Sequence, residues 1–243
     1  MKYIFASEIG LVRQENQDYL AVSEKDNAFF AVIADGIGGA KAGSLASKMA
    51  VEIMKQSFEE HDDFSSRKAV KAWFHDAITK ANHAVYRKSK RSLRYEGMGT
   101  TLIAIVMFQN EALAFNIGDS RIYIYHNKQL SCLSHDQTFA YEMYLRKQIT
   151  LKETETHPKR NILMNAVGID RKIKYEVVEI PAVWDQILLS SDGLHSYVAK
   201  EKIETILALE SMSEKKNRLI EAAYQAGGFD NVSIILIEGD QDE

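Results

Sequence analysis

Short runs of apolar and aromatic residues, some of them alternating as in Ile122-Tyr123-Ile124-Tyr125, recur along the whole chain, a pattern typical of β-strands. They predict strands at residues 3–7, 19–24, 29–34, 101–108, 111–117, 121–126, 129–133, 174–180, 186–190 and 232–237. Other segments carry apolar residues at spacings of three and four, together with Ala, Leu, Met and charged residues, as amphipathic helices do. They predict helices at about 43–60, 68–89, 137–147, 200–208 and 214–226.

The turns between predicted strands indicate the type of sheet. Only Gln109-Asn110 separates two neighbouring strands, and only His126-Asn127-Lys128 separates another pair. A parallel connection needs a dozen or more residues, so these strands form antiparallel hairpins. The sequence therefore predicts an α+β class, with antiparallel sheet covered by helices. The chain has 2 prolines and no low-complexity linker, which indicates a single domain spanning residues 1–243.

Composition narrows the range of functions. With 243 residues, of which 46% are hydrophobic, the chain can bury a substantial core. A net charge of -4 gives no field that would attract nucleic acid or an anionic membrane, so neither partner is expected. The N-terminus lacks a signal peptide, no apolar segment reaches the length of a membrane span, and Cys132 is the single cysteine. We expect a cytoplasmic monomer.

Acidic residues stand next to several of the apolar runs. Asp35-Gly36 and Asp192-Gly193 each end such a run, Asp119 follows a third, and Asp230 comes directly before a fourth. Asp and Gly are ordinary turn residues, so each site taken alone is explained by a turn. Strand-end carboxylates can also converge on one edge of a sheet, where hard cations such as Mg²⁺ or Mn²⁺ find oxygen ligands. Their number favours a metal site.

The ordered set of short motifs resembles the metal-dependent protein phosphatases of type 2C, in particular the bacterial ones. The match extends over nearly the whole chain, and the order of the motifs makes it specific. The motifs are Ser7-Glu8-Ile9-Gly10-Leu11-Val12-Arg13-Gln14-Glu15-Asn16-Gln17-Asp18, Asp35-Gly36-Ile37-Gly38-Gly39, Gly97-Met98-Gly99-Thr100-Thr101, Gly118-Asp119-Ser120-Arg121, Ser191-Asp192-Gly193 and Gly228-Phe229-Asp230-Asn231.

The resemblance implies a four-layer α-β-β-α sandwich of two antiparallel sheets flanked by helices. It also implies a serine/threonine protein phosphatase that hydrolyses phosphoserine and phosphothreonine with Mn²⁺ or Mg²⁺, by a metal-activated water and without a covalent intermediate. Two cations neutralise the charge that makes phosphate monoesters so slow to hydrolyse, and they acidify a bridging water. The implied partners are phosphorylated proteins, among them a Ser/Thr kinase or its substrates.

The same resemblance gives individual residues a role in binding the cations. Asp35 would bridge two metal ions, and the carbonyl oxygen of Gly36 would bind one of them. Asp192 and Asp230 would complete the protein ligands of the other ion. Asp35 and Asp192 are therefore the residues implied to be catalytic.

Three further roles follow from the resemblance. Asp18 would act largely through water bound to a metal, and Asp119 together with Asp192 would hold a third, weaker ion. Arg13 would bind the substrate phosphate, since a guanidinium pairs with phosphate oxygens through parallel hydrogen bonds. An isolated surface arginine would instead pair with a nearby acid such as Glu15.

The sequence departs from the family pattern at several positions. Ile37 stands where many eukaryotic members carry a histidine proposed to protonate the leaving group, and isoleucine cannot transfer protons. The general acid is therefore unassigned. Phe229 replaces a common proline and Gln17 a common glutamate, without loss of an expected metal ligand. His157 and His195 are expected to be surface or packing residues rather than catalytic ones.

Two basic segments allow both a functional and an ordinary interpretation. Residues 136–161 resemble the mobile flap of bacterial members, and their cations could contact phosphopeptides or simply face solvent. These cations are Arg146, Lys147, Lys159 and Arg160. The basic run from Arg87 to Arg91, with Arg94, is interpreted as a solvated helix end rather than a nucleic-acid patch, because no aromatic platform accompanies it.

Other classes of function are less consistent with the residues. A cysteine-based phosphatase would need an arginine six positions after Cys132, where Thr138 stands. A phosphate-binding loop would need lysine at Ser44, after the second spaced glycine. A non-catalytic member of the family that serves as a binding module remains an alternative, although such proteins usually lose metal ligands that this chain keeps.

Overall fold

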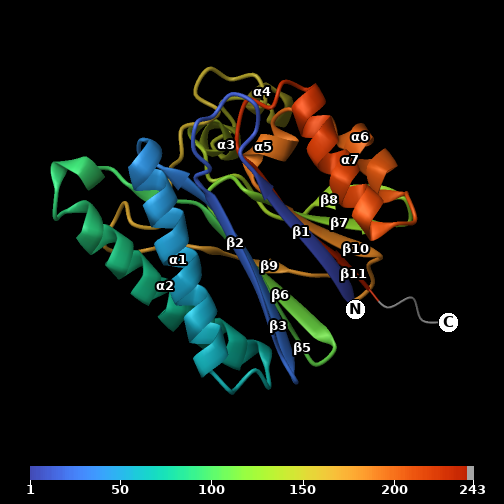
Figure 1. Ribbon diagram of the computed structural model, residues 1–243, viewed down its shortest axis with the longest axis horizontal. Coiled ribbons are helices and arrows are strands. Elements are labelled where there is room, and N and C mark those ends of the chain that lie inside the picture. Colours follow the sequence, from blue (N-terminus) through green and yellow to red (C-terminus); the bar gives the residue numbers. More distant parts are fainter. Residues whose placement is uncertain (240–243) are drawn as a thin grey trace.

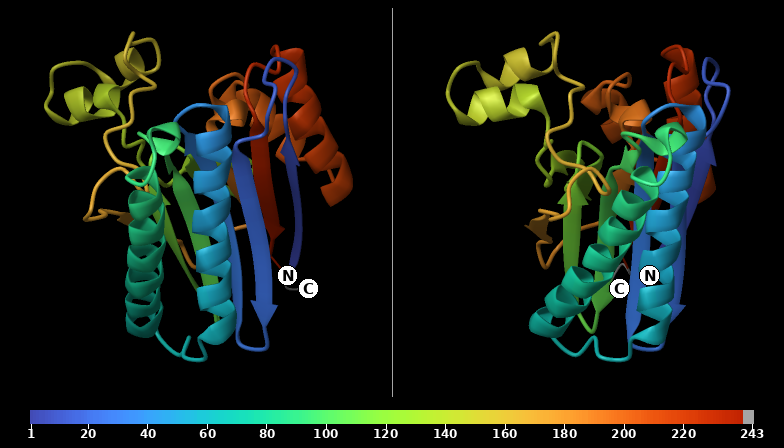
Figure 2. Two further views of the ribbon diagram at one scale, coloured as in Figure 1. Left: turned by 60° about the vertical axis from the view of Figure 1, so that its left-hand side comes forward. Right: turned by 90° about the vertical axis from the view of Figure 1, so that its left-hand side faces the viewer.

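The computed structural model describes residues 1–239, without the side chains of residues 40 and 41. Two antiparallel sheets pack face to face, and helices cover the outer face of each (Figures 1 and 2). The long helices α1 (Ala40–Glu60) and α2 (Arg67–Ser89) lie on one side, and α6 (Lys200–Leu207) and α7 (Met212–Gln225) lie on the other. The four-layer α-β-β-α architecture expected from the sequence is confirmed.

The described residues form strands and helices close to the predicted ranges. The strands are β1 (Lys2–Glu8), β2 (Asp18–Lys25), β3 (Ala28–Ile37), β4 (Gly99–Thr100), β5 (Leu102–Phe108), β6 (Glu111–Ile117), β7 (Arg121–His126), β8 (Gln129–Cys132), β9 (Glu176–Glu179), β10 (Gln186–Ser190) and β11 (Val232–Glu238). The remaining helices are the 3₁₀ turn η1 (Leu93–Tyr95), α3 (Phe139–Leu145), α4 (Leu151–Thr154) and α5 (Asp192–His195).

The strand order brings residues from distant parts of the chain side by side. One sheet runs β1-β11-β10-β7-β8, and the other runs β2-β3-β5-β6-β9, with β4 paired to the end of β3. Each sheet therefore combines strands from both halves of the sequence. In the second sheet, the register places Asp18 of β2 directly opposite Asp35 of β3.

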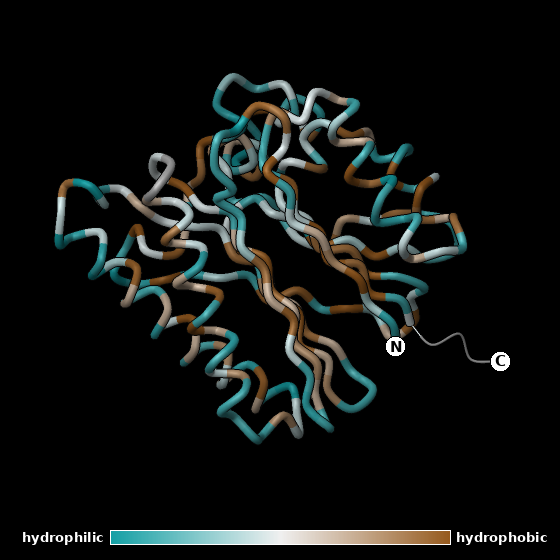
Figure 3. Tube along the Cα trace, in the orientation of Figure 1, coloured by the Kyte–Doolittle hydropathy of each residue, from teal (hydrophilic) through white to brown (hydrophobic). Residues whose placement is uncertain are grey.

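Alternation along the strands explains how one chain fills three apolar layers. In β3, Phe30 and Val32 face α1 and α2, whereas Ala31 and Ile33 face the opposite sheet. Successive side chains of a strand point to opposite faces, so a strand that is covered on both sides is apolar throughout. Figure 3 shows this concentration of hydrophobic residues on the strands, while the helices carry hydrophobic residues on one side.

The differences from the sequence prediction concern short elements and one strand end. The turns η1 and α5 and the short strand β4 contain too few residues to show a period. The strand predicted to end at residue 34 continues through Asp35 and Gly36 to Ile37, because β4 supplies hydrogen-bonding partners for this extension. Asp35 is therefore a strand residue and not a turn residue.

One end of the sandwich carries most of the irregular structure. Figure 2 shows residues 9–17, the start of α1 and the end of α2 at this end, together with α3 to α5. Helices α3 and α4 project away from the layers and belong to residues 136–161, the flap-like segment of the sequence analysis. Within residues 1–239, no helix combines the length and the apolar character that a membrane span requires.

Candidate metal centre

Five carboxylates from both sheets converge at the irregular end of the sandwich. Asp18 begins β2 and Asp35 lies opposite to it near the end of β3. Asp119 lies in the turn between β6 and β7, Asp192 begins α5 directly after β10, and Asp230 stands two residues before β11. The antiparallel topology therefore assembles a single acidic cluster from residues up to about two hundred positions apart.

Four carboxyl groups of the cluster, those of Asp18, Asp35, Asp119 and Asp192, have raised pKa values. Burial is the largest cause for each of these four, and the negative charges of nearby carboxylates add to it. Asp35 and Asp192 have pKa values well above the usual range, while those of Asp18 and Asp119 rise to about 6 and about 7. A positive charge at the cluster would favour the ionised forms of these groups.

Two carboxylate oxygens in the cluster are buried without a hydrogen-bond partner, Oδ1 of Asp18 and Oδ1 of Asp192. A buried charged oxygen without a partner is costly, and a hard cation is a partner that would satisfy it. Among the described residues, however, no three acidic, histidine or cysteine side chains form a complete ligand set. The donors present fit cations that take part of their coordination from a backbone carbonyl and water.

Hydrogen bonds between the two sheets hold Asp18 in place. The Ser191 hydroxyl donates to Oδ2 of Asp18 at 2.7 Å and accepts from the backbone N–H of Ser233 at 2.9 Å. Ser191 itself is fully buried. The residue that precedes Asp192 in the sequence thus fixes the position of a second carboxylate, Asp18, which belongs to the other sheet.

The backbone of Asp35 is fixed by the threonine pair at its side. The hydroxyl of Thr100 donates to the carbonyl oxygen of Asp35 at 2.8 Å, and the hydroxyl of Thr101 accepts from the Asp35 N–H at 3.0 Å. Thr101 also shares a hydrogen bond with the hydroxyl of Ser120, the residue after Asp119. Two carboxylates of the cluster are therefore positioned by one buried hydroxyl network.

The two Asp-Gly pairs depend on close backbone packing rather than on turn chemistry. A Cβ atom at Gly36 would lie 2.2 Å from the carbonyl oxygen of Gly43, and one at Gly193 would lie 1.9 Å from that of Asn231. Neither glycine has a positive φ angle. Glycine is needed because another segment passes directly over the backbone next to each aspartate. The turn explanation of these pairs is therefore wrong.

Residues 9–17 form a loop that Asn231 ties to the cluster. The Asn231 amide donates to the carbonyl oxygens of Ile9 and Glu15, and its oxygen accepts from the N–H of Gln17 at 2.9 Å. The loop presents Arg13, whose Nη2 lies 2.7 Å from Oδ2 of Asp230. The side chain of Arg13 is 46% exposed, so its guanidinium can contact both the cluster and a ligand in solvent.

His195, one of the two histidines considered as proton donors, is a buried residue that packs against its neighbours. Its Nδ1 lies 3.1 Å from the Ser190 hydroxyl, and its ring also hydrogen-bonds to the backbone of Asp119. Burial, with the nearby positive charge of Arg121, lowers the pKa of His195 well below its usual range. A ring that is neutral at ordinary pH lacks the acidic imidazolium proton that a general acid would donate.

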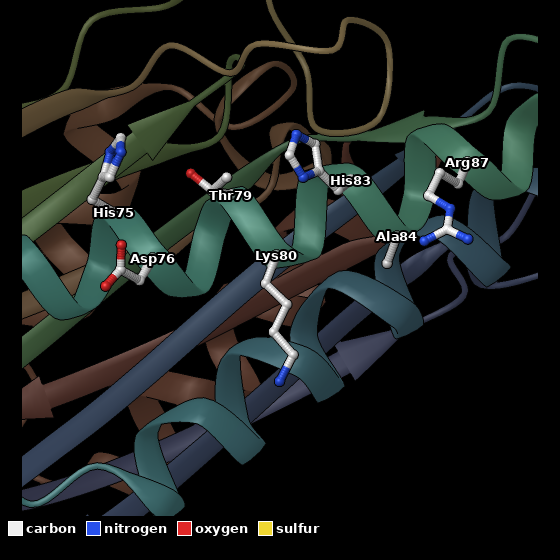
Figure 4. Close-up of a pocket in the computed structure, with 7 residues that line it drawn as sticks. All are labelled: His75, Asp76, Thr79, Lys80, His83, Ala84 and Arg87. Carbon is white, nitrogen blue, oxygen red and sulfur yellow. The ribbon is translucent and has the colours of Figure 1, made fainter.

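A hollow of about 490 Å³ on the surface of α2 is separate from this cluster (Figure 4). Its walls come from one helix only, and none of the five carboxylates lines it. The lining residues are His75, Asp76, Thr79, Lys80, His83, Ala84 and Arg87.

The structure brings together Asp18, Asp35, Asp119, Asp192 and Asp230, with Arg13 and Gly36 beside them. Sequence reasoning missed the supporting residues, above all Ser191, Thr101 and Asn231. All three belong to the short motifs already singled out, and the positions directly before Asp192 and after Asp230 were the available signal.

Comparison with known proteins identifies the family to which the chain belongs. A family model described as protein phosphatase 2C matches residues 12–222. The serine/threonine phosphatase stp of Listeria monocytogenes serotype 4b is 34% identical over 239 residues, which cover 97% of this chain and 95% of the relative.

Solved structures show the same fold. The serine/threonine phosphatase Stp1 from Staphylococcus aureus has a TM-score of 0.90 at 31% identity, with 98% of this chain and 95% of that chain covered. The catalytic domain of the phosphatase PstP, solved in complex with 2 manganese ions, has a TM-score of 0.82 at 29% identity, with 98% and 97% covered. The match of fold, motifs and sequence leads to one conclusion: the chain belongs to the protein phosphatase 2C family.

Proposed function

We propose that this protein phosphatase hydrolyses phosphoserine and phosphothreonine in proteins with Mn²⁺ or Mg²⁺ as cofactor, by direct attack of water and without a covalent intermediate. The observation that carries the proposal is the acidic cluster itself. Buried carboxylates with raised pKa values and two oxygens without a partner stand beside an arginine that reaches solvent. Structural neighbours that include a manganese complex support the choice of cation.

The side chains divide into those that would hold cations and those that orient them. Asp35, the Gly36 carbonyl, Asp192 and Asp230 would hold the two core ions, and Asp119 would take part in a third, weaker site. When bound, the ions neutralise the phosphate charge and lower the pKa of the attacking water. Asp18 would orient water at the cluster, since its Oδ1 is buried and free of protein partners.

Arg13 would bind the phosphoryl group of the substrate. Nη2 of its guanidinium lies 2.7 Å from Oδ2 of Asp230, and a guanidinium has further N–H donors that could bind a phosphate. Asp230 raises the pKa of Arg13 although burial opposes it, so the guanidinium stays charged. Such a residue contributes mainly to substrate binding, because a phosphate carries its charge before and during the reaction.

No side chain at position 37, where many related enzymes carry histidine, can donate a proton to the leaving group. Ile37 is partly buried at the end of β3 and has no proton to give. His195 is neutral and engaged with Ser190. We therefore assign no side chain as general acid and expect the proton of the leaving alkoxide to come from water at the centre.

The proposal is tested with a phosphothreonine peptide. Purified protein with Mn²⁺ should release phosphate, and both a chelator and the substitution Asp192→Asn should abolish release. Asp26→Asn, an exposed aspartate in the β2–β3 turn, serves as the matched control and should leave the rate unchanged. Tight Mn²⁺ binding without release from any phosphopeptide would instead favour the non-catalytic binding module.

A further inference from the structure

A run of cations at the end of α2 is not used by the proposed reaction. The sequence from residue 87 to 94 is RKSKRSLR, and we call its cations the basic turn. They lie in the last turn of α2 and in the loop that contains η1. The basic turn consists of Arg87, Lys88, Lys90, Arg91 and Arg94, of which all but the half-buried Lys88 are exposed.

The charge of the basic turn is not balanced by acidic side chains. Among the described residues, none of its cations makes an ion pair with a carboxylate, whereas Arg67 pairs with Glu111 and Glu179, and Arg121 pairs with Asp136. In a protein with a net charge of -4, this is a local concentration of unpaired positive charge. Such a patch attracts acidic ligands and accelerates their encounter.

Aromatic rings order part of the basic turn. Lys88 Nζ lies 4.9 Å from the ring centre of Tyr95, and Lys90 Nζ lies 5.3 Å from that of Tyr86. The guanidinium of Arg94 packs on Tyr95 as well, at 5.7 Å. The sequence offered no aromatic platform on which a base could stack, and in the structure the two tyrosine rings are in contact with the protein's own cations. Cations held over rings lose less conformational entropy when they bind a ligand.

The loop that carries the basic turn leads directly to the metal centre. After Arg94 the chain reaches Gly97, and a Cβ atom at Gly38 would lie 2.8 Å from the Gly97 carbonyl oxygen. Gly36 then pairs with Thr100. Since three residues span at most about 11 Å and the Gly97–Gly38 contact adds about 7 Å, the Cα atoms of Arg94 and Asp35 lie at most about 29 Å apart. An extended peptide covers that distance with at most about nine residues.

We infer that the basic turn binds an acidic segment of the phosphoprotein substrate, a few residues away from the phosphorylated side chain. The inference rests on the proposed function, because it assumes that the phosphate occupies the acidic cluster. The occupant is a run of Glu or Asp residues in the same substrate chain. Positive charge beside an otherwise acidic site would select such segments and fix the direction in which the substrate lies.

The test compares phosphothreonine peptides that differ only in a run of four residues, either Glu or Gln. The run is placed four to eight positions before or after the phosphothreonine. Wild-type protein should show a kcat/KM about three- to tenfold higher for the Glu peptide at one of these placements, an advantage that falls at high salt. The double substitution Arg91→Ala with Arg94→Ala should remove this advantage while leaving the Gln peptide within about twofold.

A matched control removes the same charge at another place. Lys68 and Lys202 are exposed, and Lys68 lies at the far end of α2, about 30 Å along the helix from the basic turn. Their double alanine variant should keep the preference for the Glu peptide. An equal loss for both peptides in the Arg91 and Arg94 variant, or no preference in the wild type at any placement, would overturn the inference.

The design separates this inference from the proposed function. If the wild type with Mn²⁺ fails to hydrolyse the Gln peptide, the proposed function fails, while fluorescence anisotropy of a labelled Glu peptide still reports on the basic turn. Leu93, which is 88% exposed beside these cations, makes an anionic membrane the competing ligand to test. Loss of binding to phosphatidylglycerol vesicles in the double variant, without any change in peptide kinetics, would decide for the membrane and against the inference.

Discussion

Replacing Asp18 with Asn should stabilise the protein in the absence of metal. The Asp18 side chain is 5% exposed, and its pKa rises to about 6 from the 3.8 of a solvated aspartate, chiefly because of burial. Each tenfold change in proton affinity corresponds to about 1.4 kcal/mol, so the ionised form is disfavoured in the folded protein by about 3 kcal/mol. Asparagine removes that cost and can still accept the hydrogen bond from Ser191.

The expected gain depends on pH in a defined direction. Because the pKa is higher in the folded than in the unfolded protein, the destabilisation is absent below pH 4, grows between pH 4 and 6, and is complete above pH 6. Allowing for incomplete relief, we expect Asp18→Asn to add about 1 to 3 kcal/mol at pH 8, which is a rise in Tm of about 3 to 10 °C for a chain of this size. The difference should vanish toward pH 4.

Thermal unfolding followed by differential scanning calorimetry, with a chelator present, measures this shift. Added Mn²⁺ should raise the Tm of the wild type more than that of Asp18→Asn, because the cation compensates the charge that the variant no longer carries. Asp26→Asn makes the same chemical change at the exposed far end of β2 and should leave the Tm unchanged. A lower Tm for Asp18→Asn at pH 8, or a shift that is the same at pH 8 and pH 4.5, would refute the electrostatic reasoning.

Three further substitutions probe the supporting geometry. Arg13→Ala should raise KM for a phosphothreonine peptide by about tenfold or more with little change in kcat, because a charged hydrogen bond contributes about 1.5 to 3 kcal/mol. A large fall of kcat at constant KM would contradict this role. Ser191→Ala should lower the free energy of unfolding of the Mn²⁺-loaded protein by about 1 to 3 kcal/mol in urea titrations, because it leaves Asp18 with less hydrogen bonding. Gly193→Ala should impair both folding and turnover, because the new Cβ atom would lie 1.9 Å from the Asn231 carbonyl oxygen. Circular dichroism and phosphate release measure the two effects, and wild-type values for both would show that the backbone can shift to accommodate the methyl group.

The two Asp-Gly pairs of the acidic cluster resemble turns in the sequence but do not form turns in the structure. Asp35-Gly36 and Asp192-Gly193 each follow an apolar run and have the composition of a turn. In the fold, Asp35 lies within β3 and Asp192 begins a helix, and each glycine makes room for a backbone segment that arrives from far away in the chain. Such contacts have no local signature, so no window of sequence around either pair could reveal them.

For the basic turn, the sequence shows the charge but not the contacts that the cations make. The positive charge of residues 87–94 is evident from the sequence, and so is their place at the end of a helix. Tyr86 and Tyr95 flank the run in sequence, yet only the structure shows that their rings pack against its cations. The pairing of β4 with the end of β3 then brings Gly97, which follows the basic turn, against Gly38 beside the metal centre.

The sequence by itself determined the alternating strands, the antiparallel hairpins, the long helices and the identity of the acidic residues, because side-chain period and turn length are local properties. The tertiary structure decided that Asp18 lies opposite Asp35, that Ser191 of one sheet holds a carboxylate of the other, and that Asn231 anchors the loop of Arg13. These relations depend on strand order and on the packing of two sheets, in which residues from both ends of the chain become neighbours. Raised pKa values and unpartnered oxygens arise only from that proximity, so the chemistry of the centre belongs to the fold.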